Sequence, residues 1–114
     1  MDAADMFKAL SDDTRLRIIS LLARCRDLSV SHLVEVLDAP QWHVSRHLQR
    51  LRQLGIVHAH SIGTWRYYSI RDEVRETVDH ILAAIRVRVK GSVFAHDLAR
   101  LRELLSRERR TEFL

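Results

Sequence analysis

The sequence VSHLVEVLDAPQWHVSRHLQR, residues 30–50, decides the fold of this chain. Residues 30–37 repeat apolar side chains at the spacing of one helix face. Residues 38–41 contain the only proline of the sequence, and a proline disfavours helical geometry at the residue before it. Residues 42–50 return to helical spacing, with apolar side chains four positions apart and most other positions polar or basic. The stretch therefore predicts two helices joined by a sharp turn.

The residues that follow favour a β-hairpin. Residues 56–62 and 64–70 are rich in β-branched and aromatic side chains and meet at a glycine. We expect Trp65, Tyr67 and Tyr68 to pack across the two strands. A helix, a turn, a basic helix and a hairpin in this order are typical of a winged helix-turn-helix, in which the second helix enters the major groove of DNA.

The composition predicts one globular domain that is mainly helical. The chain has 114 residues, 46% of them hydrophobic, with only 3 Gly and 1 Pro. Its single cysteine excludes an intrachain disulfide and a cysteine-only metal cluster within one chain. The acidic N-terminus does not resemble a signal peptide, and no apolar run is as long as a membrane span. We therefore expect a cytoplasmic protein.

Positive charge is concentrated in one segment. Residues 39–71 contain five Arg and four His but no Asp or Glu, so all 15 acidic residues lie elsewhere. The formal net charge is +4. This distribution predicts that the segment meets an anionic partner, for which DNA is the natural candidate. The alternative is a solvated cationic face with no partner, although such faces usually interleave both signs.

Hydrophobic periodicity divides the single domain, residues 1–114, into six helices and one hairpin. The helices are expected at about residues 2–10, 12–25, 30–37, 41–54, 72–90 and 93–110, and the wing at residues 56–70. Ser11 and Ser29 are the expected N-caps of the second and third helices. The arginines on and after the second helix either line a solvated face or contact phosphates: Arg15, Arg17, Arg24 and Arg26.

The helix expected at residues 72–90 carries a longer apolar stripe than a core of this size needs. Its members include Val78, Ile81, Leu82 and Ile85. A helix that cannot bury its stripe internally often pairs with a second copy, so these residues are predicted to form a dimer surface. The alternative is that the stripe packs on the core of its own chain.

Taken together, these segments resemble the ArsR/SmtB family of small bacterial winged-helix repressors. The most specific match is VSRHL at residues 44–48 with LGIV at residues 54–57, supported by FKALSD at 7–12, TRLRI at 14–18 and WRYYSI at 65–70. The resemblance implies a homodimer whose fourth helices enter successive major grooves of an operator with two-fold character. It implies that transcription is blocked until an effector binds. It also adds the first helix, with Met6 and Phe7, to the dimer surface.

The expected DNA-binding residues lie mostly on the helix at 41–54. They are Gln41, Trp42, His43, Ser45, Arg46, His47, Gln49 and Arg50, together with Arg66 beside the wing tip. Gln can pair with adenine and Arg with guanine, whereas Ser and His reach phosphates or base edges. Pro40 stands where the family often has a serine cap, and Trp42 where it has a small residue. The indole of Trp42 is expected either to contact DNA or to plug the core.

The residues that bind the effector in the best-known members of this family are mostly missing from this sequence. Ser29 and Ser31 stand where the family's best-known site has cysteine thiolates, and hydroxyls are poor ligands for soft metals. Of the family's site on the fifth helix, only Asp79 is present. Cys25 is therefore either a ligand or redox switch, with His32 as a candidate partner, or a small buried hydrophobe. We predict no cofactor and leave the small-molecule or ion effector unidentified.

Two histidines of the wing, His58 and His60, are two positions apart and so share one strand face. They form either a metal pair or simply part of the wing surface.

Three classes of function follow for the whole chain. The basic segment favours a sequence-specific transcriptional regulator that acts as a repressor. The second class is a winged helix that binds proteins through its long apolar helices, without specific DNA binding. The third, an enzyme, lacks support because no base, nucleophile or phosphate loop occurs at a suitable spacing.

Overall fold

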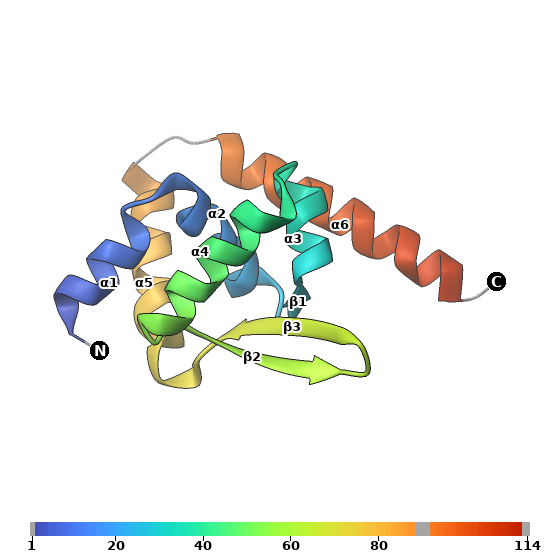
Figure 1. Ribbon diagram of the computed structural model, residues 1–114. Coiled ribbons are helices and arrows are strands. Elements are labelled where there is room, and N and C mark those ends of the chain that lie inside the picture. Colours follow the sequence, from blue (N-terminus) through green and yellow to red (C-terminus); the bar gives the residue numbers. More distant parts are fainter. Residues whose placement is uncertain (1, 89–91, 113–114) are drawn as a thin grey trace.

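The computed structural model describes residues 2–88 and 92–112 (Figure 1). The elements in chain order are α1 (Ala3–Leu10), α2 (Asp13–Arg24), β1 (Leu28–Ser29), α3 (Val30–Leu37), α4 (Gln41–Gln53), β2 (Val57–Ile62), β3 (Trp65–Ile70), α5 (Asp72–Arg88) and α6 (Ser92–Glu112). The last two residues of the helix expected at 72–90 lie outside the described residues. No described helix combines the length and the apolar character that crossing a membrane requires.

Side-chain caps set where α2 and α3 begin. Ser29 caps α3 as expected, and its hydroxyl accepts from the backbone N–H of His32 at 3.2 Å. The His32 imidazole returns a bond by accepting from the Ser29 backbone N–H, which completes a capping box. The prediction for Ser11 is wrong. Asp12 caps α2, whereas the Ser11 hydroxyl donates to the Lys8 carbonyl at the end of α1.

The turn between α3 and α4 is short. Asp38 ends α3 with a φ of 50°, in the left-handed region that Asp tolerates better than most residues. Pro40 then precedes α4 in an extended conformation. This turn sets α4 across α3, which is the helix-turn-helix arrangement expected from the sequence. Gly55, with a φ of 81°, turns the chain out of α4 towards the wing.

A three-stranded antiparallel sheet supports the wing, with the strand order β1-β3-β2. β2 and β3 pair from Val57↔Ile70 to Ile62↔Trp65. β1 was not predicted, because two residues are too short to show a periodic pattern. It pairs with the middle of β3, Leu28 opposite Tyr68, and so ties the hairpin to the chain before α3.

The core collects apolar side chains from nearly every element. The fully buried ones include Ala9, Ile18, Ile19, Leu22, Leu28, Leu33, Val44, Leu48, Leu51, Ile56, Val57 and Val78. Three of them come from α4, so one face of this helix is committed to the fold. The opposite face of α4 is consequently free to meet a partner.

α6 packs along α2 and α3 and runs past them to the C-terminus (Figure 1). Leu101 and Leu104 are buried in this contact. Arg17 on α2 forms a bidentate ion pair with the buried Asp97 of α6, with both N···O distances 2.8 Å. Arg107 reaches Glu35 of α3 at 2.8 Å. The helix is thereby held by apolar contacts and by charge.

The stripe on α5 is divided between core and surface. Val78 and Leu82 are buried in the core of their own chain, as is Met6 of α1. These three side chains, expected at a dimer surface, have almost no area left for a partner. Ile81 and Ile85 are only half-buried, and Phe7 of α1 is 68% exposed. Of the residues predicted at the dimer surface, Phe7, Ile81 and Ile85 are therefore the ones that a second copy can reach.

Candidate nucleic-acid interface

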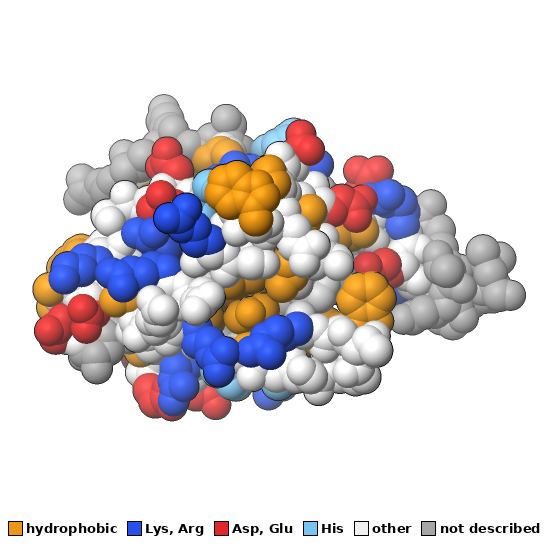
Figure 2. Space-filling view, viewed as in Figure 1, with side chains coloured by type: hydrophobic (Ala, Val, Ile, Leu, Met, Phe, Trp, Pro, Cys, Tyr) orange, Lys and Arg blue, Asp and Glu red, His pale blue; other side chains and the backbone are white. Residues whose placement is uncertain are grey.

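The outer face of α4 presents an exposed row of polar, cationic and aromatic side chains. Its members follow one another at helical spacing: Trp42, Arg46, Gln49, Arg50 and Gln53. The α4 side chains on the opposite face are apolar and buried. Figure 2 shows Lys and Arg over the face that α4 presents, with acidic side chains to either side of it. This separation of faces suits a helix that lies in a groove lined by phosphates.

An open groove runs beside this row, between α4 and the start of α2. Of the residues that line it, Gln53 was not named from the sequence, and Arg15 was not placed beside α4. Gln53 continues the spacing of Gln49 and Arg46, so the periodicity could have indicated it. Arg15 lies 32 positions before the residue of α4 that it contacts, His47, and no local pattern reports such a contact.

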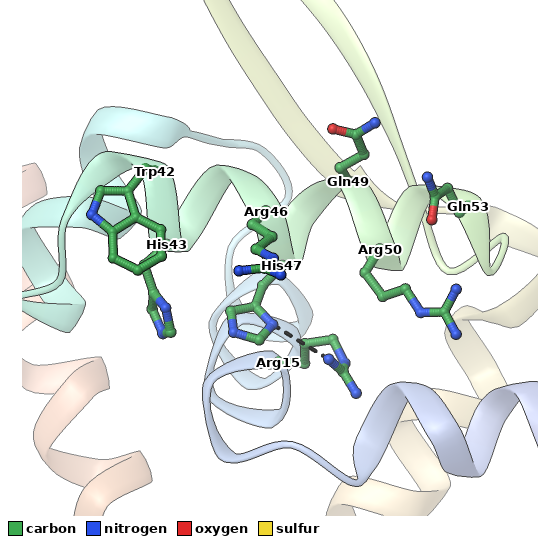
Figure 3. A pocket seen from close by; sticks show the side chains of 8 residues that line it. All are labelled: Arg15, Trp42, His43, Arg46, His47, Gln49, Arg50 and Gln53. Carbon is green, nitrogen blue, oxygen red and sulfur yellow. Dashed lines mark hydrogen bonds between the residues drawn. The ribbon is translucent and has the colours of Figure 1, made fainter.

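His43 and His47 point from α4 towards α2, whereas Gln49 points away from it (Figure 3). Nε2 of His43 lies 3.3 Å from the Thr14 hydroxyl. Nδ1 of His47 lies 3.4 Å from the Arg15 guanidinium and 3.7 Å from the Asp12 carboxylate. The side chain of His47 is 14% exposed. Both imidazoles were expected at DNA, but within the chain they hold α4 against α2.

Arg15 joins three helices at this point. Its Nε donates to the Ala9 carbonyl at 3.1 Å and its Nη2 to the Lys8 carbonyl at 2.9 Å, both at the end of α1. The positive charge of Arg15 also interacts favourably with the negative, C-terminal end of the α1 dipole. Since Nη1 lies 3.4 Å from Nδ1 of His47, the guanidinium links α1 to α4. The sequence offered a solvated face or a phosphate contact for Arg15, and the structure adds a third role, a contact within the chain.

The surroundings of His47 disfavour its charged form. Burial lowers the pKa of the imidazole most. The Asp12 carboxylate opposes this shift, while three neighbouring groups lower the pKa further: His43, Arg15 and Arg46. Burial alone would raise the pKa of Asp12, but the hydrogen bond from the Arg15 backbone N–H, the charge that His47 carries once it is protonated and the charge of Arg15 hold it below its usual value. The contact is therefore built for a neutral His47 and an ionised Asp12.

We expect the wild-type protein to lose stability between about pH 7.5 and 5.5 partly through His47. With a lowered folded-state pKa, the unfolded chain takes up the proton first as the pH falls below about 6.5. The stabilisation is complete above that pH and declines below it. The free energy of unfolding in urea, measured at both pH values, should fall less in His47→Gln than in the wild type. His96 is exposed, so His96→Gln is the control. An equal pH response in the wild type and in His47→Gln would contradict the assignment.

The other predicted positions at the start of α4 are accessible to different degrees. Gln41 is exposed, whereas Ser45 is half-buried. Trp42 is 65% exposed, so it does not plug the core. Pro40 provides no side-chain cap, which leaves the first backbone N–H groups of α4 without an acceptor from a capping side chain. Such a helix N-terminus favours a phosphate oxygen.

The wing carries its cation on one face. Arg66 lies with its guanidinium carbon 5.9 Å from the centre of the Tyr68 ring and donates to the Tyr68 hydroxyl at 3.3 Å. Tyr68 is buried and packs as expected, and Tyr67 stacks on His60 at 6.0 Å. Trp65 lies opposite Ile62 in the strand register, as cross-strand packing requires, but its side chain is 56% exposed near the hairpin tip.

The weak metal candidates have other contacts. Burial raises the pKa of the Cys25 thiol, which contacts the Asp27 carbonyl oxygen at 3.7 Å. His32 uses one nitrogen in the capping box and the other on Glu108 at 2.8 Å. His58 and His60 lie on one face, with ring centres 6.2 Å apart. Within the part of the chain that the structure describes, no three His, Cys, Asp or Glu side chains are arranged to hold a metal ion.

A helix-turn-helix with a basic, exposed second helix and a hairpin beside it defines a winged-helix DNA-binding protein. A family model described as "Bacterial regulatory protein, arsR family" matches residues 12–59. The arsenic resistance transcriptional regulator ArsR1 of Pseudomonas putida is 38% identical over 99 residues, which cover 87% of this chain and 77% of the relative. The chain therefore belongs to the ArsR family, and it is a DNA-binding transcriptional regulator.

Solved structures support the same assignment. The homodimeric winged helix-turn-helix DNA-binding domain of a possible ArsR-family regulator from Mycobacterium bovis superimposes with a TM-score of 0.69 at 27% identity, over 76% of this chain and 81% of that one. HlyU from Vibrio cholerae has a TM-score of 0.66 at 27% identity, over 77% and 92%. These relatives favour DNA binding over a module that only binds proteins.

Proposed function

We propose that two copies of this chain bind an operator with two-fold character and repress transcription from it. The observation that carries this proposal is the exposed face of α4, where Arg46 and Arg50 stand at helical spacing on a helix without any acidic residue. In the proposed complex, this face reads bases in the major groove. Arg66 on the wing approaches a neighbouring phosphate or the minor groove. The chain has no enzymatic role and acts in the cytoplasm.

A homodimer would place two recognition helices on successive turns of the duplex. The surface that we propose for this contact is formed by α1 and α5. Phe7 is its most exposed apolar side chain, flanked by the half-buried Ile81 and Ile85. The solved domain from Mycobacterium bovis is itself homodimeric. That likeness supports the proposed assembly.

We propose that the effector which releases the repressor is not sensed by cysteine thiolates in α3. Relatives are named as arsenic and cadmium resistance regulators. In this chain Ser29 caps α3 with its hydroxyl and Ser31 offers another hydroxyl, so neither can supply a thiolate. We propose that the protein senses another effector or represses constitutively. Release from DNA by arsenite in a Cys25→Ser variant would contradict the claim that any thiol sensing uses Cys25.

Affinity for DNA should fall steeply with salt. A duplex is first selected from a randomised library with the wild-type protein, and its binding is then titrated between about 50 and 200 mM salt. If the two copies together neutralise about six phosphates, the affinity decreases about 1,000-fold over this range. The reason is that each neutralised phosphate releases counterions whose return is favoured by salt.

The control for this titration is Arg102→Ala, which removes an exposed cation from α6, away from the proposed interface. Its salt dependence should match that of the wild type. A flat salt profile, or failure to select any duplex, would overturn the proposal and favour a module that binds only proteins.

A further inference from the structure

The tip of the wing exposes two large apolar side chains directly opposite each other. Ile62 ends β2 and Trp65 begins β3, and the two are partners in the strand register. Ile62 is 59% and Trp65 is 56% exposed. Between them the chain turns through Gly63, whose φ of 61° suits a two-residue hairpin loop. The two side chains can pack on each other across the strands, but more than half of each remains exposed, and this apolar area points to contact with a partner.

The charge around the tip is suited to a polyanion. No Asp or Glu occurs between Ala39 and Arg71, so the wing and α4 belong to the same acid-free segment. Arg66 follows Trp65 immediately, and Tyr68 holds its guanidinium in place. A partner must therefore offer negative charge and an apolar surface close to each other. Duplex DNA does so in its minor groove, where phosphates border the groove and stacked bases form its floor.

Dimensions determine what such a contact would do to the duplex. A β-ribbon with its side chains is about 10 Å thick, whereas the minor groove of B-DNA is about 6 Å wide. Among the large side chains of the wing, only Ile62 and Trp65, next to the Gly63-Thr64 loop, can reach the floor of an unaltered groove. Arg66 follows Trp65 but lies on the other face of the ribbon, where its guanidinium rests over the Tyr68 ring. From there it can meet a phosphate at the groove edge. Deeper entry requires the groove to open.

We propose that Ile62 and Trp65 form an apolar wedge that enters the minor groove beside the site of α4 and opens one base step. The indole of Trp65 stacks on the exposed base, and Ile62 fills the other side of the gap. Apolar side chains inserted in this way bend the duplex towards the major groove. The inference rests on the proposed function and assigns to the wing a role in the shape of the bound DNA.

Two optical measurements on bound DNA test the wedge. The probe is a duplex of about 40 bp recovered by selection with the wild-type protein. A dye at each end reports the end-to-end distance by energy transfer. In a set of such duplexes, 2-aminopurine replaces one base at a time at the steps beside the site of α4. The wild type should shorten the distance between the ends, and 2-aminopurine should brighten where it forms the side of the opened step that Ile62 fills, because that base has lost its stacking partner. In Trp65→Ala both signals should fall by more than half, and affinity should decrease about 10-fold.

Ile62→Ala should weaken both signals to a smaller extent, because the indole provides the larger stacking surface. Val93→Ala is the matched control: Val93 is also an exposed apolar residue, 39% exposed, but it lies on α6. It should leave the end-to-end distance and the 2-aminopurine signal unchanged. Thermal unfolding verifies that each variant is folded, as expected for substitutions at exposed positions.

Several outcomes would overturn the wedge. If the selected duplex binds but stays straight, or if Trp65→Ala bends it as the wild type does, the wedge is refuted while the proposed function stands. If Trp65→Ala changes the sedimentation of the protein without DNA, the tip is a contact between copies instead. If no duplex can be selected, the proposed function fails and the wedge fails with it.

Discussion

Replacing Arg17 with Met is expected to lower the free energy of unfolding by about 3–5 kcal/mol. The Asp97 side chain is only 1% exposed, and the Arg17 guanidinium meets both of its oxygens at 2.8 Å. Asp97 in turn raises the pKa of Arg17, chiefly because its carboxylate accepts hydrogen bonds from the guanidinium. Removing the cation leaves a buried carboxylate without its counterion. Urea unfolding of the variant at about pH 7.5 measures this decrease in stability.

Two further variants test whether the buried charge is the cause. In Arg17→Met with Asp97→Leu, apolar side chains replace both partners, and most of the stability should return. Arg71→Met breaks an ion pair with Glu73 in which both side chains are exposed, and should change stability little. A double variant as unstable as Arg17→Met alone would show that the destabilisation reflects packing rather than an unpaired charge.

Much of the fold could be predicted because local patterns determine it. The apolar spacing in α3 and α4, with a proline between them, is sufficient to predict the helix-turn-helix. Ser29 was predicted as a cap from its place before an apolar stripe, and the structure confirms it. Ser11 was wrongly predicted, because Asp12, one position later, is an equally good cap and only the chain path decides between them. β1 depends on pairing with β3, which is distant in sequence.

The candidate site divides in the same way. Arg46, Gln49 and Arg50 are exposed, as expected from their distance from the buried face of the same helix. His43 and His47 follow a similar spacing, but they contact α2, and periodicity cannot tell which neighbouring element covers a flank.

For the predicted dimer surface too, periodicity cannot tell what covers an apolar face. An apolar stripe on α5 predicts burial, but it does not reveal whether the cover is the chain's own core or a second copy. The structure assigns Val78 to the former. Non-local packing therefore decides the residues that local patterns leave open.

Replacing Arg46 with Ala should remove base preference more than it removes general affinity. Arg46 is exposed in the middle of the outer face of α4, where a guanidinium can pair with guanine in the major groove. One such pair contributes about 1–3 kcal/mol of discrimination, so binding of a dimer to the selected duplex should weaken by about 2–6 kcal/mol. Competition binding against random duplex at constant salt measures both affinities, and the random duplex should be affected far less.

Arg66→Ala provides the contrast, because its guanidinium is held on the wing by Tyr68 and is placed to meet a phosphate. It should weaken binding to the selected and random duplexes by similar factors. It should also reduce the slope of log affinity against log salt by about 1 for each phosphate that is no longer neutralised, hence by about 2 for a dimer. If both variants weakened binding equally on both duplexes, α4 would not be reading sequence through Arg46. Base recognition would then have to come from the uncharged side chains exposed on the same face, of which Gln49 and Trp42 are the strongest candidates.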